Sequence, residues 1–313
     1  MLNKGGTRLE LKIRQLLLDY FPQRIQENLA VFSEEKLNSI TEIRCRLAKP
    51  LQVIWSRNER KTFTEIILQQ KEMDYLLLRL NQGSVYAWQE EYKRGYLTLP
   101  GGHRVGLVGK AVLEQGRVKT LYNISSLNFR IAHEVYGAAD KLLPYLREEG
   151  AVVNTLLVAP PGCGKTTMLR DVIRQLSAEF TVGVVDERSE IAATVNGISQ
   201  LDVGWSTDVL DSCPKSEGMK MLIRSMAPDI LATDEIGTRE DIIAVEEALQ
   251  AGISVILTAH GKNIEDIYHH PYLSHLTQYT LLKRIVILAQ QDQVGEIKEV
   301  YAAKDGEYFS LLR

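Results

Sequence analysis

The chain has 313 residues, of which 45% are hydrophobic and 25% charged, a composition typical of a soluble globular protein with about two domains. No apolar run is long enough to span a membrane, the first residues do not form a signal peptide, and the three cysteines have neither metal-site nor disulfide spacing. Residues 1–150 contain 23 basic and 17 acidic residues, whereas residues 151–313 contain 14 and 23, so the net charge of −3 combines two halves of opposite sign. We therefore expect a cytoplasmic protein with a domain boundary close to Gly150.

Residues 1–150 are predicted to form a small α+β domain that serves in interaction or oligomerisation. Apolar residues at helical spacing predict an amphipathic helix that ends near Pro22, and alternating polar and apolar residues predict two strands within 42–55. The turn Pro100-Gly101-Gly102 lies between two further predicted strands. Helices are expected over 64–81 and 139–146. We find no catalytic constellation in this half.

A glycine-rich loop begins the second half. Residues 159–167 follow the apolar run 155–158 and precede an amphipathic segment, which is the strand–loop–helix context of the phosphate-binding P-loop. Gly162 and Gly164 allow backbone N–H groups to turn around a polyphosphate. Lys165 supplies a charge for the β- and γ-phosphates, and Thr166 supplies a hydroxyl for Mg²⁺. The sequence thus predicts ATP and Mg²⁺ as ligands, with the nucleotide bound by Pro160, Pro161, Gly162, Cys163, Gly164, Lys165, Thr166 and Thr167.

The rest of residues 151–313 alternates between apolar strands and helices. We expect strands over 181–185, 230–233, 253–260 and 284–289, a helix over 239–251, and a hairpin around Asp305-Gly306. Such alternation predicts an α/β domain with a mainly parallel sheet that is covered by helices on both faces. Ligands then bind beyond the carboxyl ends of the strands, where the acidic residues of this half are found.

Two acidic pairs, Asp186-Glu187 and Asp234-Glu235, each end a predicted strand. ATP hydrolysis needs a carboxylate near Mg²⁺ and a group that activates or orients water. In the simplest P-loop enzymes the acidic residue closely follows the P-loop, which favours Asp186. In RecA-like ATPases an extra strand intervenes, and this arrangement favours the later pair. We assign Asp234 to the Mg²⁺ shell and Glu235 to water activation.

The first acidic pair is predicted to have a secondary role. Asp186, Glu187 and Glu190 either order metal-bound waters or form a solvated strand end that is paired with Arg188. His260 follows an apolar strand, so it either contacts the γ-phosphate or Glu235, or is structural. The predicted catalytic set is Glu235, Asp234, Lys165, His260 and Glu187, and the predicted metal set is Thr166, Asp234 and Asp186.

Residues 221–236 are similar to the Walker B region of the type II and type IV secretion and pilus ATPases, and residues 185–190 to their aspartate box. The stretches 102–106, 129–132 and 160–167, together with 185–190, more closely resemble the stage III sporulation protein AA family of endospore-forming bacteria. This resemblance extends over nearly the whole chain. It implies a RecA-like ATPase domain and a homohexamer in the mother cell, which docks on membrane proteins of a channel at the inner face of the membrane.

Oligomeric ATPases of this kind complete the site with an arginine from a neighbouring domain or subunit. The candidates are Arg104, Arg130, Arg224 and Arg239. The main hypothesis is an ATP-hydrolysing motor for a membrane-bound export machine. The alternatives are a nucleic-acid-dependent ATPase, which is disfavoured because no aromatic run is interleaved with basic residues, and a nucleotide switch with little turnover.

Overall fold

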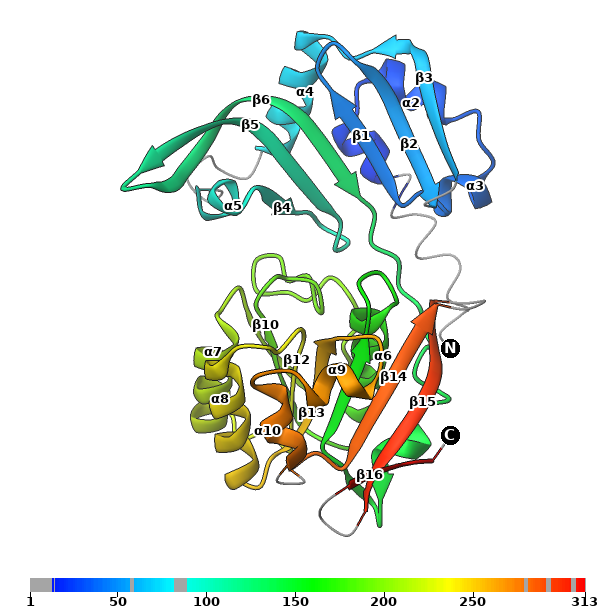
Figure 1. The fold of residues 1–313 in the computed structure, drawn as a ribbon. Helices are drawn as coiled ribbons and strands as arrows, with labels where there is room; N and C mark the ends of the chain where they lie inside the picture. The colour runs from blue at the N-terminus through cyan, green and yellow to red at the C-terminus, as the bar shows by residue number, and fades with distance from the viewer. Residues whose placement is uncertain are drawn as a thin grey trace. The chain divides into compact units, whose positions relative to one another are not determined.

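The computed structural model divides into two units, Met1–His133 and Glu134–Arg313. Figure 1 shows the elements of each unit. In the part of the chain that the structure describes, no helix is long and apolar enough to cross a membrane. The described residues are 13, 15–56, 59–81, 89–278, 281–290, 294–304 and 308–312.

The first unit is built on a six-stranded antiparallel sheet with the order β3-β2-β1-β6-β5-β4. Alternate residues of β1 and β2 are buried, as a two-residue side-chain period requires. The core includes Phe21 and Phe129, whose ring centroids are 4.6 Å apart. The strands are β1 (Glu42–Arg46), β2 (Pro50–Ser56), β3 (Glu59–Ile67), β4 (Tyr96–Thr98), β5 (Arg104–Glu114) and β6 (Arg117–Arg130); the helices are α2 (Gln23–Leu29), α3 (Glu34–Asn38), α4 (Gln70–Leu80) and α5 (Gln89–Arg94), and residues 15–20 are also helical.

The prediction of one helix over 64–81 is wrong in its first part. Residues 64–67 belong to β3, which pairs antiparallel with β2 and buries Phe63 and Ile66. Tertiary pairing of β-branched and aromatic residues here overrides the helical spacing. The helix α4 begins only after Gln69, whose capping box with Glu72 satisfies backbone N–H groups at the helix start.

The two units meet in the sequence before the boundary expected near Gly150. Ala139 and Leu146 are buried in the core of the second unit, where the Ala139 N–H donates to Asp171 at 2.8 Å. The helix predicted over 139–146 is wrong: turns precede a short 3₁₀ helix, η1 (Leu143–Leu146), in which a proline restricts the backbone.

The second unit contains an eight-stranded sheet with the order β11-β10-β12-β13-β9-β14-β15-β16. The strands from β11 to β14 are parallel, and β15 and β16 extend the sheet antiparallel. This confirms the predicted mainly parallel sheet and the hairpin strands, although the turn Asp305-Gly306 lies outside the described residues. The strands are β9 (Thr155–Ala159), β10 (Val182–Asp186), β11 (Thr207–Asp211), β12 (Ile230–Thr233), β13 (Ser254–His260), β14 (Arg284–Gln290), β15 (Val294–Lys304) and β16 (Tyr308–Leu311), with a separate pair β7 (Arg147–Glu148) and β8 (Ala151–Val152).

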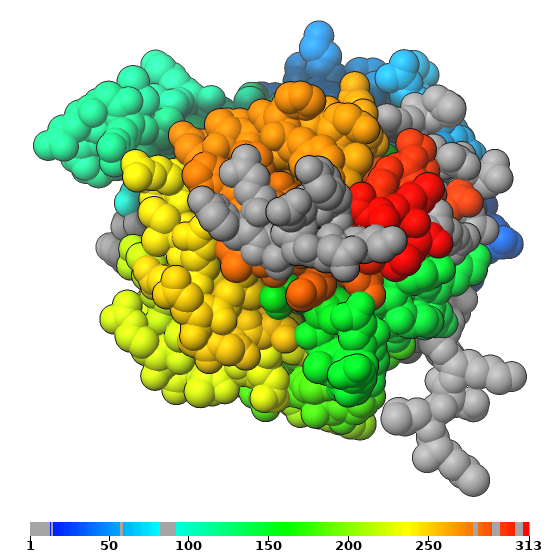
Figure 2. Space-filling view, turned by 60° about the horizontal axis from the view of Figure 1, so that its bottom comes forward, coloured from blue at the N-terminus to red at the C-terminus, as the bar shows by residue number. Residues whose placement is uncertain are grey.

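Helices cover both faces of this sheet, as predicted. One core joins α6 (Lys165–Leu176) to strand residues such as Leu157, and a second core joins the opposite helices to residues such as Val158. Successive strand residues thus enter different cores, so the buried strands are apolar throughout. The opposite helices are α7 (Lys215–Ser225), α8 (Arg239–Gln250), α9 (Ile264–Tyr268) and α10 (Leu273–Gln278), of which α10 contacts both α8 and α9. In Figure 2 the yellow and orange residues of this part of the chain adjoin one another on the surface.

Candidate functional site

The glycine-rich loop lies at the carboxyl end of β9 and leads directly into α6. Gly162 and Gly164 have φ values of +76° and +80°, a backbone conformation that a side chain disfavours. Lys165 is the first residue of α6, and its Nζ donates to the carbonyl oxygens of Ala159 at 2.8 Å and Pro160 at 3.3 Å. The loop and the amino end of a twelve-residue helix together form an arrangement suited to an anion.

The side chains of this loop differ in their exposure. Lys165 and Cys163 are buried, whereas Thr166 and Thr167 are half-buried in the first turn of α6. Burial lowers the pKa of Lys165, and the negative charges of Glu235 and Asp234 oppose this shift. The structure thus brings the predicted P-loop lysine within electrostatic reach of the second acidic pair.

Asp234 follows β12 and is only 1% exposed. Within the described residues, its Oδ2 atom is buried and has no hydrogen-bond partner. Burial, helped by the charges of Asp186, Glu190 and Glu235, raises the pKa of Asp234 to about 7. An unpartnered buried carboxylate oxygen is costly, and a Mg²⁺ ion or its bound water would supply the missing partner. Asp234 therefore fits the predicted metal role.

Glu235 has an unusual backbone and an exposed side chain. Its φ is +48°, in the left-handed region that non-glycine residues rarely adopt. The Glu235 N–H donates to the buried hydroxyl of Thr258 on β13 at 2.9 Å. Its Oε2 accepts a hydrogen bond from Arg188 Nη1 at 3.2 Å. The sequence analysis did not identify Thr258, because nothing in the order of residues reveals a bond between neighbouring strands.

Asp186 ends β10 and is fully buried. Its Oδ1 accepts the N–H of Glu190 at 2.8 Å, and its Oδ2 accepts those of Ile191 and Ala192 at 3.0 and 2.8 Å. Burial raises the pKa of Asp186, although these hydrogen bonds oppose the shift. Because both oxygens are bonded to the backbone, this geometry favours a loop-organising role for Asp186 over the metal role expected from the sequence.

The loop after Asp186 is further fixed by two buried or half-buried cations. Arg170 of α6 donates through Nε to the carbonyl of Ile191 at 2.5 Å and through Nη2 to that of Glu190 at 2.6 Å. Lys215 at the start of α7 forms an ion pair with Glu187. Glu187 is therefore held by α7, and neither cation was singled out by the sequence analysis.

His260 is the last residue of β13 and is exposed. In the sheet it stands opposite Ala159, the residue that opens the glycine-rich loop. Parallel strands place their carboxyl ends at one edge, so His260, the loop and the Asp234-Glu235 pair share that edge. Five predicted residues are thus gathered there: Lys165, Thr166, Asp234, Glu235 and His260.

The candidate arginines are distributed over different parts of the chain. Arg104 and Arg130 stand opposite each other on β5 and β6 of the first unit, and the Arg104 guanidinium lies 3.8 Å from the ring centroid of Tyr96. Arg239 opens α8 and is exposed. Arg224 lies near the carboxyl end of α7, next to Ile223.

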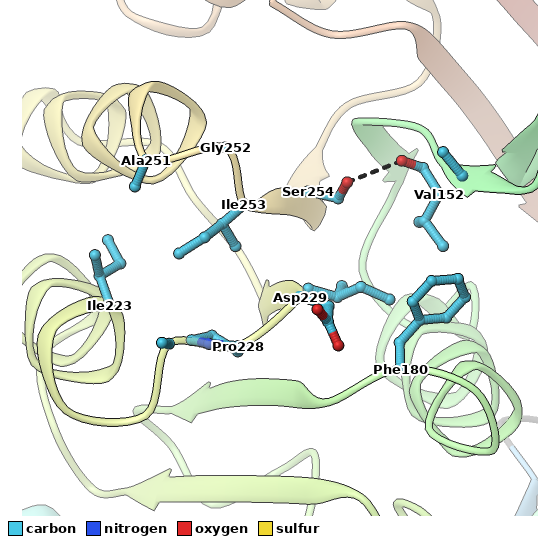
Figure 3. Close-up of a pocket in the computed structure, with 12 residues that line it drawn as sticks. Val152, Phe180, Ile223, Pro228, Asp229, Ala251, Gly252, Ile253 and Ser254 are labelled. Atoms are coloured by element: carbon cyan, nitrogen blue, oxygen red, sulfur yellow. Dashed lines mark hydrogen bonds between the residues drawn. The ribbon is translucent and has the colours of Figure 1, made fainter.

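Ile223 belongs to a pocket of about 350 Å³ at the amino ends of β12 and β13 (Figure 3). Its apolar lining includes Phe180 and Ile253, and the Ser254 hydroxyl donates to the Val152 carbonyl at 2.9 Å. Because these strands are parallel, this pocket lies at the edge opposite the glycine-rich loop. Arg224 is therefore remote from the loop within its own chain.

The described residues contain no group of three His, Cys, Asp or Glu side chains that could hold a metal ion. Mg²⁺ is commonly bound by one or two carboxylates together with substrate phosphates. The arrangement at this edge is therefore suited to a metal ion that is bound together with a polyphosphate.

A family model described as "Sporulation stage III, protein AA" matches residues 12–308. The chain is 40% identical over 300 residues to the stage III sporulation protein AA of Bacillus subtilis (strain 168), which covers 94% of this chain and 96% of that protein. The solved structure of the Legionella pneumophila ATPase DotB aligns with a TM-score of 0.56 and 14% identity over 94% of this chain and 80% of that one. The pilus retraction motor PilT, solved with bound ADP, aligns with a TM-score of 0.56 and 15% identity over 92% and 80%. These structural likenesses show that the fold is that of the RecA-like P-loop ATPases. The family match and the B. subtilis relative show that the chain belongs to the stage III sporulation protein AA family.

Proposed function

We propose that this protein is an ATP-hydrolysing motor that energises a membrane-associated export or channel apparatus during endospore formation. The observation that carries the proposal is the buried, unpartnered Oδ2 of Asp234, next to Glu235 and within electrostatic reach of Lys165. A bound metal ion or its water would satisfy this oxygen, which has no partner among the described residues.

In this proposal the glycine-rich loop binds the phosphates of ATP through its backbone N–H groups. Lys165 exchanges its bonds with the Ala159 and Pro160 carbonyls for bonds to the β- and γ-phosphates. Thr166 and Asp234 hold the metal shell. Mg²⁺ bound with ATP neutralises charge on the phosphate oxygens.

The chemical step is assigned to Glu235, whose carboxylate orients the attacking water and accepts its proton. His260, at the same edge of the sheet, is assigned to contact the γ-phosphate or Glu235. Glu187 is held by Lys215 and is assigned a supporting role in this scheme.

We further propose that the motor is a homohexamer in the mother cell, at the inner face of the membrane, where it docks on membrane proteins of the channel. The family name and the fold shared with DotB and PilT support this reading. An arginine from another subunit would complete the site, and Arg104 and Arg130 remain among the candidates named from the sequence.

The test is ATP turnover by the full chain, measured beside Glu235→Gln and the matched control Glu240→Gln, an exposed residue in the first turn of α8. We expect Glu235→Gln to bind nucleotide and to turn over on the order of a hundredfold more slowly, with the control unchanged. Equal turnover in all three proteins, measured on assembled protein, would favour the alternative of a nucleotide switch with little turnover. Stimulation by single-stranded DNA that falls with salt would favour the nucleic-acid-dependent ATPase.

A further inference from the structure

Arg188 contacts the residue to which the proposed function assigns water activation. Its Nη1 lies 3.2 Å from Glu235 Oε2, and the two side chains are 55% and 44% exposed. An ion pair that is this exposed adds little to stability. The effect of this contact is therefore to be sought in the orientation of the Glu235 carboxylate and not in the stability of the fold.

The loop that carries Arg188 is fixed from several sides. Asp186 accepts three of its backbone N–H groups, and Arg170 donates to two of its carbonyls. Ser189, with a left-handed φ of +52°, donates its hydroxyl to Asp211 Oδ1 on β11 at 2.6 Å. These contacts fix the backbone on both sides of Arg188, and thereby the position from which its exposed side chain extends.

Glu235 is fixed through its backbone but not through its side chain. Thr258 holds the N–H of Glu235 from β13, whereas the carboxylate is exposed and reaches Arg188 through Oε2. A carboxylate has two oxygens, so Oε1 can still accept a proton from water. Arginine remains protonated at all working pH values and cannot take that proton itself.

We propose that Arg188 is a positioning residue for Glu235: it orients the carboxylate so that the second oxygen faces the water that attacks ATP. This inference rests on the proposed function. In this role Arg188 does not contact the phosphates. It therefore differs from the arginine of another subunit that would complete the site.

The experiment uses the full chain with Arg188→Ala, Arg188→Lys, Glu235→Gln and the double variant Arg188→Ala/Glu235→Gln. Arg147→Ala, which removes the arginine of another Arg–Glu ion pair, the one with Glu179, is the matched control. We measure ATP turnover, the affinity for Mg-ADP, the affinity for a non-hydrolysable ATP analogue, and the affinity for Mg-ADP with aluminium fluoride, a mimic of the transition state.

We expect Arg188→Ala to lower kcat and the affinity for the aluminium fluoride complex by about tenfold, with the affinities for Mg-ADP and the ATP analogue unchanged. Arg188→Lys should recover part of the loss, because it keeps the charge but not the planar fork. In the Glu235→Gln background, Arg188→Ala should cause no further loss, because the two residues act as one unit.

Three outcomes overturn the inference. If Arg188→Ala lowers the affinity for the ATP analogue, Arg188 contacts the phosphates directly. If the losses in the double variant add, Arg188 acts independently of Glu235. If Arg188→Ala raises turnover, Arg188 inhibits hydrolysis. If the wild-type protein hydrolyses ATP and Arg188→Ala equals it in every measurement, the motor proposal stands and this inference fails. If the wild-type protein binds no nucleotide, both fail.

Discussion

The hydroxyl of Thr258 accepts the backbone N–H of Glu235 at 2.9 Å, and the carbonyl of Thr258 accepts that of Ile236 at the same distance. Thr258 is fully buried on β13, which lies between β9 and β12 in the sheet. The strand next to the glycine-rich loop therefore fixes the left-handed backbone of the residue assigned to activate water.

Replacing this hydroxyl tests its importance. Thr258→Val keeps the shape of the side chain and leaves the Glu235 N–H without its acceptor, so we expect the unfolding free energy to fall by about 1–2 kcal/mol. Turnover should fall by about tenfold or more, because the Glu235 carboxylate is then misplaced. The matched control is Thr233→Val, since the Thr233 hydroxyl donates to the Val185 carbonyl at 2.9 Å. Urea unfolding and ATP turnover are measured together. Equal losses of turnover in both variants would contradict a specific role for Thr258.

The raised pKa of Asp234 predicts that a neutral residue at this position would make the protein more stable and less active. Its folded pKa lies near 7, above its ordinary value of 3.8, so the folded protein keeps a proton that the unfolded chain releases between those values. The contribution of Asp234 to stability therefore falls as pH rises through this window. We expect Asp234→Asn to stabilise the nucleotide-free protein at pH 8, by at most about 4 kcal/mol, and to have a much smaller effect at pH 4.

The same substitution should raise the Mg²⁺ concentration that is needed for half-maximal turnover, because it removes a proposed metal ligand. Urea unfolding at pH 4 and pH 8, with turnover measured across Mg²⁺ concentrations, checks both parts. An equal effect on stability at the two pH values would contradict the raised pKa, whereas normal turnover would contradict the metal role alone.

The loop-organising role of Asp186 predicts a structural defect that needs no nucleotide. Asp186→Ala leaves three backbone N–H groups without acceptors, so the unfolding free energy should fall by about 3 kcal/mol or more, and hydrogen exchange should accelerate over residues 187–192. The control is Asp208→Ala on the neighbouring strand β11. If Asp186→Ala changes only the response to Mg²⁺, the metal role is restored.

The two left-handed glycines predict a selective loss of binding. Gly164→Ala should lower the unfolding free energy by about 1–2 kcal/mol, because its φ is +80°, and should prevent the backbone from approaching a phosphate. Gly116→Ala is the control, since its φ is +77° and nothing lies within 4 Å of an added methyl group. Both variants should lose similar stability, and only Gly164→Ala should lose affinity for a fluorescent ATP analogue. Equal affinities of the two variants for the ATP analogue would show that the glycine-rich loop does not bind the nucleotide.

The elements of the second unit could be predicted because local and global signals agree there. The strand over 230–233 coincides with β12, and the helix predicted over 239–251 is α8, which ends one residue earlier than predicted. Both have continuous apolar patterns and clear ends: α8 begins at Thr238 with a capping box and ends before Gly252. Where the pattern was ambiguous, as in 64–67, pairing with β2 decided the outcome.

The residues of the site could be listed from the sequence, but their contacts could not. The strand-end position of Asp186 predicted a metal ligand, and only the folded loop shows that its oxygens are used by the backbone. Arg170 had no motif to mark it, because its role depends on where α6 passes the loop. Motifs indicate which chemistry is present, whereas the hydrogen bonds decide which carboxylate is available for it.

The bonds of Arg170 have a mechanical consequence. The helix that begins at the glycine-rich loop and the loop that carries Arg188 are joined by two half-buried hydrogen bonds from Arg170, which couple their positions. Under the proposed function, filling or emptying the phosphate cradle would be felt at Glu235 through α6, the loop of Arg188 and the Arg188–Glu235 contact. The proposed function then gains a local route by which hydrolysis follows the occupancy of the nucleotide site.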